Sequence, residues 1–375
     1  MDSNNHRDEF PITKNYNFQN HAGVSPLSRR AAEAMRTYIA ECVSTSYVGR
    51  KWYAHVDHVR QLAADLIGAN GDEIAFVKNT TEGLAFLATG LKWMTGDNVI
   101  TTSVEFPANI YPWMNLQARG VRLKMVIEEN GRIPLDRIIE AIDSRTRVVS
   151  ISAVQFASGF RTDLAALGAA CQEKGVILCV DAIQALGVLP IDVQAMHIDV
   201  LSADGHKWMC GPEGAGIFYL RKELLGHVKP SIVGWMGMKN ATDYGNYQFE
   251  FLDDARRFEC GSYNVAGLYG LGASLELFLE IGVDRIWSHV RTLTDRLVTG
   301  LRDKGYRVIS SRQPGEESGI VAFISDVHDH NEVQRHLQAE HRIVLAVREG
   351  RLRSSPHLYN TTDEIDQLLD ALPRH

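Results

Sequence analysis

Short apolar runs and longer amphipathic segments follow one another along most of the chain. The apolar runs are rich in β-branched residues, so each is expected to form a strand buried on both faces of a parallel sheet. These runs lie at residues 74–77, 98–102, 121–127, 146–154, 176–180 and 215–220. Helical segments are expected before and between them, at residues 29–42, 52–67, 79–90, 109–119, 134–142 and 164–174. Alternation at this spacing predicts an α/β fold with a mostly parallel, doubly wound sheet.

The pattern changes after residue 220. Residues 229–260 are richer in Gly, Tyr and Phe and less periodic, which is typical of a long loop near an active site or a subunit contact. Helices are then expected at residues 265–281 and 283–304, followed by alternating strands and helices at residues 306–309, 319–324, 331–340, 343–347 and 362–372. The sequence therefore predicts an N-terminal segment (1–20), a large domain (21–264) and a smaller C-terminal α+β domain (265–375).

Composition narrows the class of protein. The 375 residues are 45% hydrophobic and 23% charged, which is ordinary for a globular enzyme with a sizeable core. The net charge of −7 gives no general attraction to nucleic acid or to an anionic membrane. No apolar run reaches the roughly 18 residues of a membrane helix, and the first fifteen residues lack the apolar core of a signal peptide. A cytoplasmic location is expected.

Metal and nucleotide chemistry are not expected. The five cysteines show no CxxC spacing and are odd in number, and the fourteen histidines form no HExxH pair. The chain has neither a GxGxxG motif after a first strand nor a GxxxxGK[ST] loop, which argues against a nucleotide-binding protein.

The most informative stretch begins at the predicted strand 176–180. Asp181 ends that strand, Gln184 follows one turn later, and Gly-His-Lys-Trp comes at 205–208. Ligands bind beyond the carboxyl ends of such strands. Lys207, between a histidine and a tryptophan, is a candidate for a lowered pKa and Schiff-base chemistry. Alone, the aspartate is more often a turn or helix cap and the lysine a surface charge; together they indicate a site.

A second candidate segment is Asn79-Thr80-Thr81-Glu82-Gly83, which follows a predicted strand and begins a helix. Backbone N–H groups, threonine hydroxyls and the positive end of the helix dipole suit a phosphate. A simple N-cap explains the segment equally well when it is considered alone.

Strand, Asp181, Gln184 and Gly-His-Lys-Trp together resemble the cofactor site of fold-type I pyridoxal-phosphate enzymes. More narrowly, they resemble the class V aminotransferase family, which includes cysteine desulfurases, kynureninase and isopenicillin-N epimerase. The resemblance extends from Asn20-His21-Ala22-Gly23 to Tyr359-Asn360-Thr361, nearly the whole chain. It implies that Lys207 holds pyridoxal 5'-phosphate as an aldimine and that an amino acid exchanges onto it and reacts through a Cα carbanion.

The resemblance also implies roles for the other residues. Asp181 would keep the pyridine nitrogen protonated, so that the ring acts as an electron sink. Side chains implied to contact the cofactor elsewhere are Thr80, Thr81 and His206 at the phosphate, and Gln184 and Gln155 at the phenolic oxygen. Phe106 stands where desulfurases have a histidine over the ring; it can stack but cannot transfer protons, so general acid–base work falls mainly on Lys207.

One position departs from the family pattern. Where relatives have a small residue three positions before the lysine, this chain has Asp204. A carboxylate beside a phosphate is repulsive unless it points away, and Ser202 is the fallback candidate for a third phosphate contact.

The C-terminal segment resembles the one whose arginine clamps the substrate carboxylate. Its position before Tyr-Asn-Thr makes that arginine Arg353, with Arg348 a less secure partner and Arg351 solvated. Asn20 and His21, at the other end of the resemblance, are also expected at the substrate.

The segment Arg257-Phe258-Glu259-Cys260-Gly261-Ser262 resembles RFExGT, in which the last residue reaches the phosphate of the neighbouring subunit. Ser262 would have that role here, and a homodimer with shared active sites is implied.

The activity is left with alternatives. Desulfurases carry a persulfide-forming cysteine shortly before the clamping arginine, and here no cysteine follows Cys260. We therefore expect an aminotransferase or an isopenicillin-N epimerase-like enzyme. The alternatives are a desulfurase or lyase that cleaves a C–S bond, or another β/γ-elimination, without that cysteine, and a non-catalytic binding protein that keeps the fold.

Overall fold

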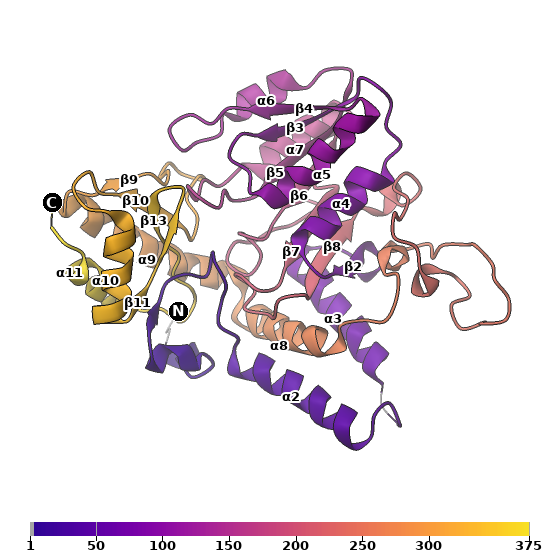
Figure 1. Ribbon diagram of the computed structural model, residues 1–375, viewed down its shortest axis with the longest axis horizontal. Helices are drawn as coiled ribbons and strands as arrows, with labels where there is room; N and C mark the ends of the chain where they lie inside the picture. The colour runs from indigo at the N-terminus through magenta and orange to yellow at the C-terminus, as the bar shows by residue number, and fades with distance from the viewer. Residues whose placement is uncertain (1–3, 50, 375) are drawn as a thin grey trace.

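A seven-stranded sheet forms the centre of the large N-terminal part (Figure 1). We describe the fold from a computed structural model, which places residues 4–49 and 51–374. The sheet contains β2 (Ile74–Val77), β3 (Asn98–Thr102), β4 (Arg122–Val126), β5 (Thr146–Ser152), β6 (Ile177–Asp181), β7 (Val200–Asp204) and β8 (Gly216–Leu220). Their order is β2-β8-β7-β6-β5-β3-β4, and β8 alone runs in the direction opposite to the other six strands. The predicted α/β fold with a mostly parallel sheet is confirmed.

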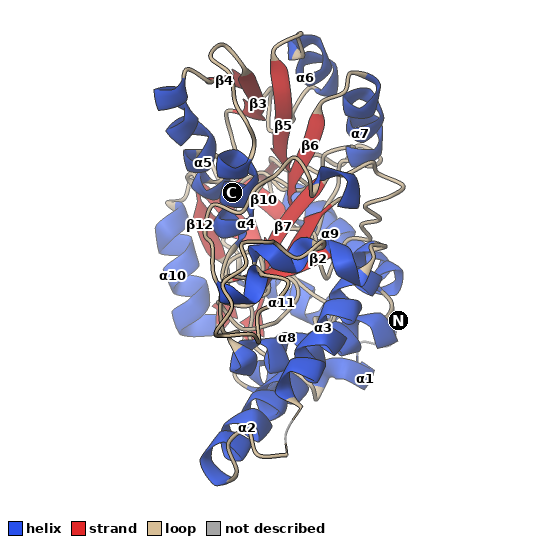
Figure 2. Cartoon of the chain, turned by 90° about the vertical axis from the view of Figure 1, so that its right-hand side faces the viewer, coloured by secondary structure: helices blue, strands red, loops and turns tan. Residues whose placement is uncertain are grey.

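Both faces of this sheet are buried, which explains why its strands are continuous apolar runs. Alternate residues belong to different cores: Val99, Val148 and Val200 pack on one face, and Ile100, Val149 and Leu201 on the other. Helices α4 (Thr80–Gly90) and α5 (Tyr111–Met114) cover the first face. Helices α3 (Trp52–Ile67), α6 (Leu135–Ala141), α7 (Leu164–Glu173) and α8 (Val265–Ile281) cover the second. Figure 2 shows α4 and α5 on one side of the strands and α6 and α7 on the other.

Two local predictions differ from the structure. The predicted helix at 109–119 is broken into the 3-10 helices Pro107–Asn109 and Asn115–Arg119 with α5 between them, because Pro112 has no N–H for a continuous helical ladder. Strand β7 was not predicted, although all five of its residues are buried. Ser202 and Asp204 interrupt the apolar run in the sequence, although both are buried in the structure.

The C-terminal part combines helices with a second sheet and is seen at the left of Figure 1. Helix α9 (Val283–Asp303) leads into an antiparallel sheet of order β12-β13-β10-β9. Its strands are β9 (Arg307–Val308), β10 (Val321–Ile324), β12 (Ala346–Arg348) and β13 (Arg351–Ser354). Helices α10 (His330–His341) and α11 (Thr362–Ala371) pack with α9 around a separate apolar core.

The N-terminal segment connects the two parts. After α1 (Asn4–Arg7), β1 (Asn17–Phe18) pairs in parallel with β11 (Ile343–Val344) of the C-terminal part. Helix α2 (Arg29–Ser44) then begins at Ser28, whose hydroxyl accepts from the Ala31 N–H as an N-cap. Helix α8 packs against α2 and α3. The expected start of the C-terminal domain at residue 265 stays a prediction.

The loop between residues 229 and 260 extends away from the body of the molecule (Figure 1). Its regular structure consists of the 3-10 helices Trp235–Gly237 and Ala255–Phe258 and one isolated antiparallel bridge between Met238 and Phe251. Four of its aromatic residues are exposed, among them Tyr247 at 95% and Phe249 at 74%, whereas Phe258 is buried in the core. Within the placed residues no single helix is both long and apolar enough to cross a membrane; α8 and α9 meet the two conditions only as a pair, and they bend by 80° where they meet.

Candidate functional site

The predicted site residues meet at the carboxyl edge of the large sheet. Strands β5, β6 and β7 are in register there, with Ser152 paired to Asp181 and Asp181 to Ser202. A cavity of about 460 Å³ opens at this edge, and all but three of the predicted residues line it: Asn20, Thr80, Thr81, Phe106, Asp181, Gln184, His206, Lys207 and Arg353. The three others, Gln155, His21 and Ser262, lie elsewhere. A larger cavity of about 690 Å³ contains none of them.

Lys207 projects into the cavity from the turn after β7. Its Nζ lies 5.4 Å from the centre of the Phe106 ring, within reach of a cation–π contact. Burial lowers the pKa of Lys207 to about 8; Asp181 opposes this shift, while Arg353 and Arg348 add to it. The amine is therefore neutral and nucleophilic in part near neutral pH, as Schiff-base chemistry requires.

Asp181 ends β6 with its side chain 2% exposed. Its Oδ1 accepts from the Ile183 N–H at 3.0 Å. Burial raises the pKa of Asp181 to about 7, with repulsion from Glu105 acting in the same direction. A carboxylate held in this way is stabilised by a cationic partner, and a protonated pyridine nitrogen is such a partner.

The raised pKa predicts a pH dependence for the cofactor-free protein. Between the unfolded pKa of about 3.9 and the folded pKa of about 7, the folded state retains a proton that the unfolded chain has lost. Asp181 should therefore lower the free energy of unfolding as pH rises through this window, by up to about 4 kcal/mol. Urea unfolding at several pH values should show this slope in the wild type and a flatter one in Asp181→Asn. Equal slopes in the two proteins would contradict the prediction.

The N-terminus of α4 forms one wall of the cavity. Asn79 caps the helix by accepting from the Glu82 N–H, which leaves the threonine side chains free for other contacts. Thr80 is fixed to β7 twice, because its Oγ1 accepts from the Asp204 N–H at 3.1 Å and its carbonyl accepts from the Ser202 hydroxyl at 2.9 Å. A Cβ on Gly83 would come within 2.3 Å of that hydroxyl, so the helix lies as close to the sheet as glycine allows.

These contacts correct one expectation. Ser202 was the fallback candidate for a third phosphate contact, but its side chain is fully buried and donates to Thr80. It therefore positions the helix end instead of facing the cavity.

The structure also explains how Asp204 is accommodated. Its Oδ2 accepts from His206 Nδ1 at 2.8 Å, and its Oδ1 accepts from the Gly205 N–H at 2.7 Å. Both oxygens are committed to the turn, and the negative charge is next to an imidazole. The pair fixes His206 with Nδ1 bound, which leaves Nε2 for a ligand.

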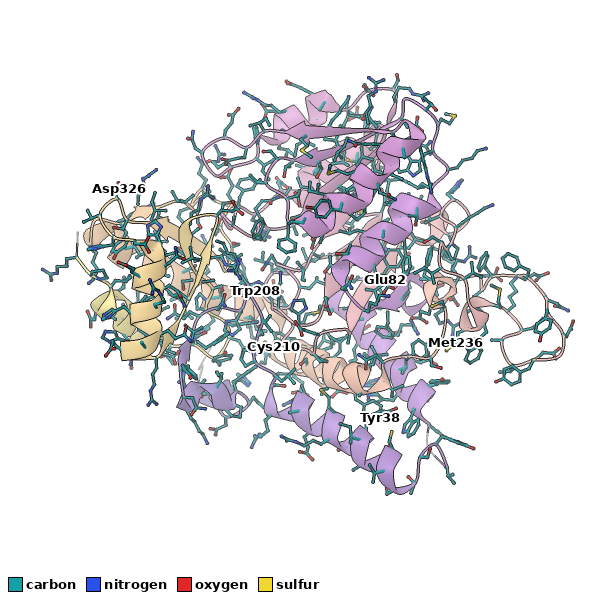
Figure 3. The ribbon with its side chains drawn as sticks, viewed as in Figure 1. Tyr38, Glu82, Trp208, Cys210, Met236 and Asp326 are labelled. Atoms are coloured by element: carbon teal, nitrogen blue, oxygen red, sulfur yellow. The ribbon has the colours of Figure 1, made fainter. Side chains whose placement is uncertain are left out.

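Gln184 is held from two directions at the bottom of the cavity. Its Nε2 donates to the Ala22 carbonyl at 3.1 Å, and its Oε1 accepts from Trp208 Nε1 at 2.8 Å. The amide retains one N–H for a ligand. Trp208 is 1% exposed and lies in the centre of the molecule in Figure 3. The tryptophan beside the lysine thus orients a side chain of the site.

Gln155 lies in an adjoining cavity of about 230 Å³ instead. Its Nε2 donates to Glu105 Oε1 at 2.7 Å, and its Oε1 is buried without a hydrogen-bond partner. Phe156 lines both cavities and packs edge-on against Phe106 at 5.2 Å between ring centres. The contact of Gln155 with the phenolic oxygen stays a prediction.

Glu105 is a residue that the sequence reasoning missed. Its carboxylate is buried and accepts hydrogen bonds from side chains or backbone of Thr102, Asn109, Ser152 and Gln155. It connects the ends of β3 and β5 beside Asp181. Its place after a predicted strand end was the available signal.

Arg353 approaches the cavity from β13 and is 1% exposed. Its Nη1 donates to the Phe156 carbonyl at 2.7 Å, Nη2 makes a long 3.5 Å contact with Asn20 Oδ1, and Nε has no partner. Burial lowers the pKa of Arg353 to about 9, and nearby Arg348 adds to the shift. A buried guanidinium without a carboxylate partner suits an anionic ligand.

His21 and Ser262 are not brought to this cavity. His21 is fully buried, with Nδ1 bonded to the Ser355 carbonyl and Nε2 to the Tyr359 hydroxyl. Burial lowers its pKa well below the usual value, with His357 adding to the effect. It joins the N-terminal segment to the C-terminal part, and its expected substrate contact stays a prediction. Ser262 is exposed and lines a separate cavity with Phe76 and Tyr263.

The segment before Arg353 is a tight β-hairpin. Strands β12 and β13 pair up to Arg348 and Arg351, so Glu349 and Gly350 alone form the turn. Both have positive φ, 48° and 69°, which is typical of a type I′ turn. The hairpin leaves no room for a longer mobile loop at this point.

Comparison with known proteins gives a consistent result. The model of the family "Aminotransferase class-V" matches residues 18–368. The chain is 30% identical over 396 residues to a probable cysteine desulfurase of Methanothermobacter thermautotrophicus, covering 98% of this chain and 96% of that protein. It is also 30% identical over 371 residues to the uncharacterized aminotransferase YcbU of Bacillus subtilis, with the same coverage. The apo structure of a cysteine desulfurase from Thermococcus onnurineus NA1 superimposes with a TM-score of 0.90 at 25% identity, covering 98% of this chain and 96% of that one.

Proposed function

The chain belongs to the class V aminotransferase family, of fold type I and dependent on pyridoxal phosphate, and we propose that it exchanges the amino group of an α-amino acid. Lys207 moves the proton at Cα, and Arg353 binds the α-carboxylate. The observation that supports this proposal is the single basic amine in the cavity, with its pKa lowered to about 8 by burial. Of the other titratable groups there, His206 is bonded to Asp204.

The residues present fit pyridoxal phosphate. A cavity of about 460 Å³ is within the range of small-molecule sites. It presents a carboxylate, an amine and an aromatic ring, in Asp181, Lys207 and Phe106, and the N-terminus of a helix whose first residues are threonines. Thr80, Thr81 and His206 would hold the phosphate, Asp181 the ring nitrogen and Gln184 the phenolic oxygen. When bound, the cofactor supplies an electron sink for negative charge at Cα.

Lys207 would act as the base for the Cα proton without a second base at the position of Phe106. Phe106 occupies the position next to its amine and has no proton to transfer. A base on one face can remove and return protons only on that face, which suits amino-group exchange; inversion at Cα needs proton delivery to both faces. The geometry therefore favours transamination over epimerisation.

Sulfur transfer to a protein thiol is not supported by the site. The cysteines are Cys42, Cys171, Cys179, Cys210 and Cys260, and none lines the cavity. The two-residue turn at Glu349 and Gly350 closes the hairpin at which a thiol-bearing loop would be inserted. A second candidate is C–S bond cleavage that releases sulfur to solvent, and the desulfurase names of the relatives favour it.

The stoichiometry of one half-reaction tests the proposal. A transaminase given only an amino-acid donor should form about one keto acid per active site and stop until a keto-acid acceptor is added, because the amino group stays on the enzyme. Keto acid, sulfide and the chirality of remaining substrate should be measured on a panel of amino acids. Continuous sulfide release without an acceptor would favour the second candidate, and racemised substrate without keto acid would indicate epimerisation.

We also propose a homodimer in which Ser262 reaches the phosphate site of the partner. Ser262 is exposed and lies outside the Lys207 cavity of its own chain, which supports this arrangement. So do the exposed aromatic side chains of the 229–260 loop, among them Tyr244 and Tyr247. Sedimentation should show a dimer. A cytoplasmic location stays a prediction.

A further inference from the structure

The β12–β13 hairpin presents three arginines on one face. Cross-strand partners point to the same side of an antiparallel pair, and residues two apart along a strand share that side. Arg348 pairs with Arg351, and Arg353 follows two positions later. Val347 and Leu352 occupy the other face and pack in the C-terminal core. The alternation therefore gives the hairpin an apolar inner face and a guanidinium face.

Two of the three arginines reach the substrate cavity. Arg348 and Arg353 line the cavity of Lys207, while Arg351 lines the adjoining one. Arg348 is exposed and donates one hydrogen bond, from Nη1 to the Val347 carbonyl. Among the placed residues, neither Arg348 nor Arg353 has a carboxylate within ion-pair distance. The cavity thus contains two guanidinium groups without acidic partners.

One carboxylate is sufficient for Arg353. Its Nη1 is used by the Phe156 carbonyl, so the remaining edge, Nε and Nη2, matches one bidentate carboxylate. The acidic side chains of the cavity are used elsewhere, Asp204 by His206 and Asp181 by the position expected for the ring nitrogen. An α-carboxylate on Arg353 consequently leaves the positive charge of Arg348 unmatched.

We propose that the substrate is an α-amino acid with a second anionic group at the end of a short side chain, which Arg348 binds while Arg353 binds the α-carboxylate. This inference rests on the proposed function, since it specifies the substrate class of the same site. Side-chain carboxylates and sulfinates share the required chemistry. Arg348 acts as a specificity-determining residue, and neutral amino acids bind without its contribution.

Calorimetric titration of the holoenzyme tests the second anion site without turnover. Succinate and butyrate have the same carbon chain length and differ in one carboxylate. The wild type should bind succinate at least about tenfold more tightly than butyrate, as expected of one charge-assisted pair. Arg348→Gln should remove this difference, with a much smaller effect on butyrate binding than on succinate binding. Arg348→Lys should retain part of it, because the charge remains but the planar fork is lost.

Arg351→Gln is the matched control, because it removes a guanidinium from the same hairpin face but from the other cavity; it should keep the preference for succinate. Equal binding of the two acids by the wild type would overturn the proposal. So would a loss of butyrate binding in Arg348→Gln as large as that of succinate, which would make Arg348 part of the α-carboxylate clamp.

Amino-acid substrates separate this inference from the proposed function. Arg348→Gln should raise KM at least about tenfold for aspartate, glutamate or cysteine sulfinate, whichever the wild type uses, and change KM for neutral amino acids by a much smaller factor. If no amino acid shifts the absorption band of the cofactor while succinate still binds preferentially, the proposed function fails and the anion site stands. If the wild type uses neutral amino acids with the same kcat/KM as acidic ones, the anion site fails and the proposed function stands.

Discussion

Replacing Lys207 with alanine is expected to lower kcat by about 10⁴-fold. The amine is the base for the Cα proton, and the cavity offers no substitute, since His206 is bound to Asp204 and the Phe106 ring is inert. Turnover of the best amino-acid substrate should be measured in the cofactor-saturated variant. Borohydride should fix the cofactor to the wild-type protein and not to Lys207→Ala.

The exposed Lys92 provides a matched control. Lys92→Ala removes the same functional group at the surface and should leave kcat unchanged. Both variants should keep the thermal stability of the wild type or exceed it, because Lys207 is a desolvated amine whose pKa is already lowered. A Lys207→Ala protein with full turnover would refute the mechanism.

Replacing Arg353 with methionine is expected to raise KM about 100-fold, with a smaller effect on kcat. The guanidinium donates charge-assisted hydrogen bonds to the α-carboxylate, and losing them costs about 3 kcal/mol. Folding should not suffer, because Arg353 is 1% exposed, has no carboxylate partner and has its pKa lowered to about 9. Steady-state kinetics and urea unfolding of the same variant measure the two effects.

Arg60 offers the opposite case for comparison. It is also buried, at 4% exposure, but its guanidinium forms two hydrogen bonds to Glu259, at 2.7 and 3.1 Å. Arg60→Met should reduce the free energy of unfolding by about 3 kcal/mol or more, because it leaves Glu259 buried and unpaired. If Arg353→Met lost as much stability while KM stayed the same, Arg353 would be structural.

The cavity residues could be predicted because short motifs already determine their relative placement. Asp181 ends a strand of uninterrupted apolar residues, and the carboxyl ends of parallel strands meet at one edge. Thr80 begins a helix directly after a strand, so its place at that edge follows from local order. Each of these residues is positioned by the element on which it lies.

Residues positioned by distant segments could not be placed in the same way. His21 was expected at the substrate, but its ring bonds to Ser355 and Tyr359, more than 330 positions away. Gln155 sits one residue from the cavity wall, and its amide is turned by Glu105. Strand β7 was missed because Ser202 and Asp204 interrupt its apolar pattern, and their polar groups are satisfied by α4 and His206. A single sequence does not reveal such pairings.

The pairing of the N-terminal segment with the C-terminal part bears on how the protein is made. During synthesis, residues 17–23 leave the ribosome long before β11, Arg353 and Ser355, to which they bind. The large sheet can form while these partners are still missing, but Ala22, whose carbonyl orients Gln184, lacks its hydrogen bond to the Ser355 hydroxyl until that residue emerges. Cofactor capture is consequently a late event, and stalled chains that end before residue 343 should fold their sheet and stay colourless.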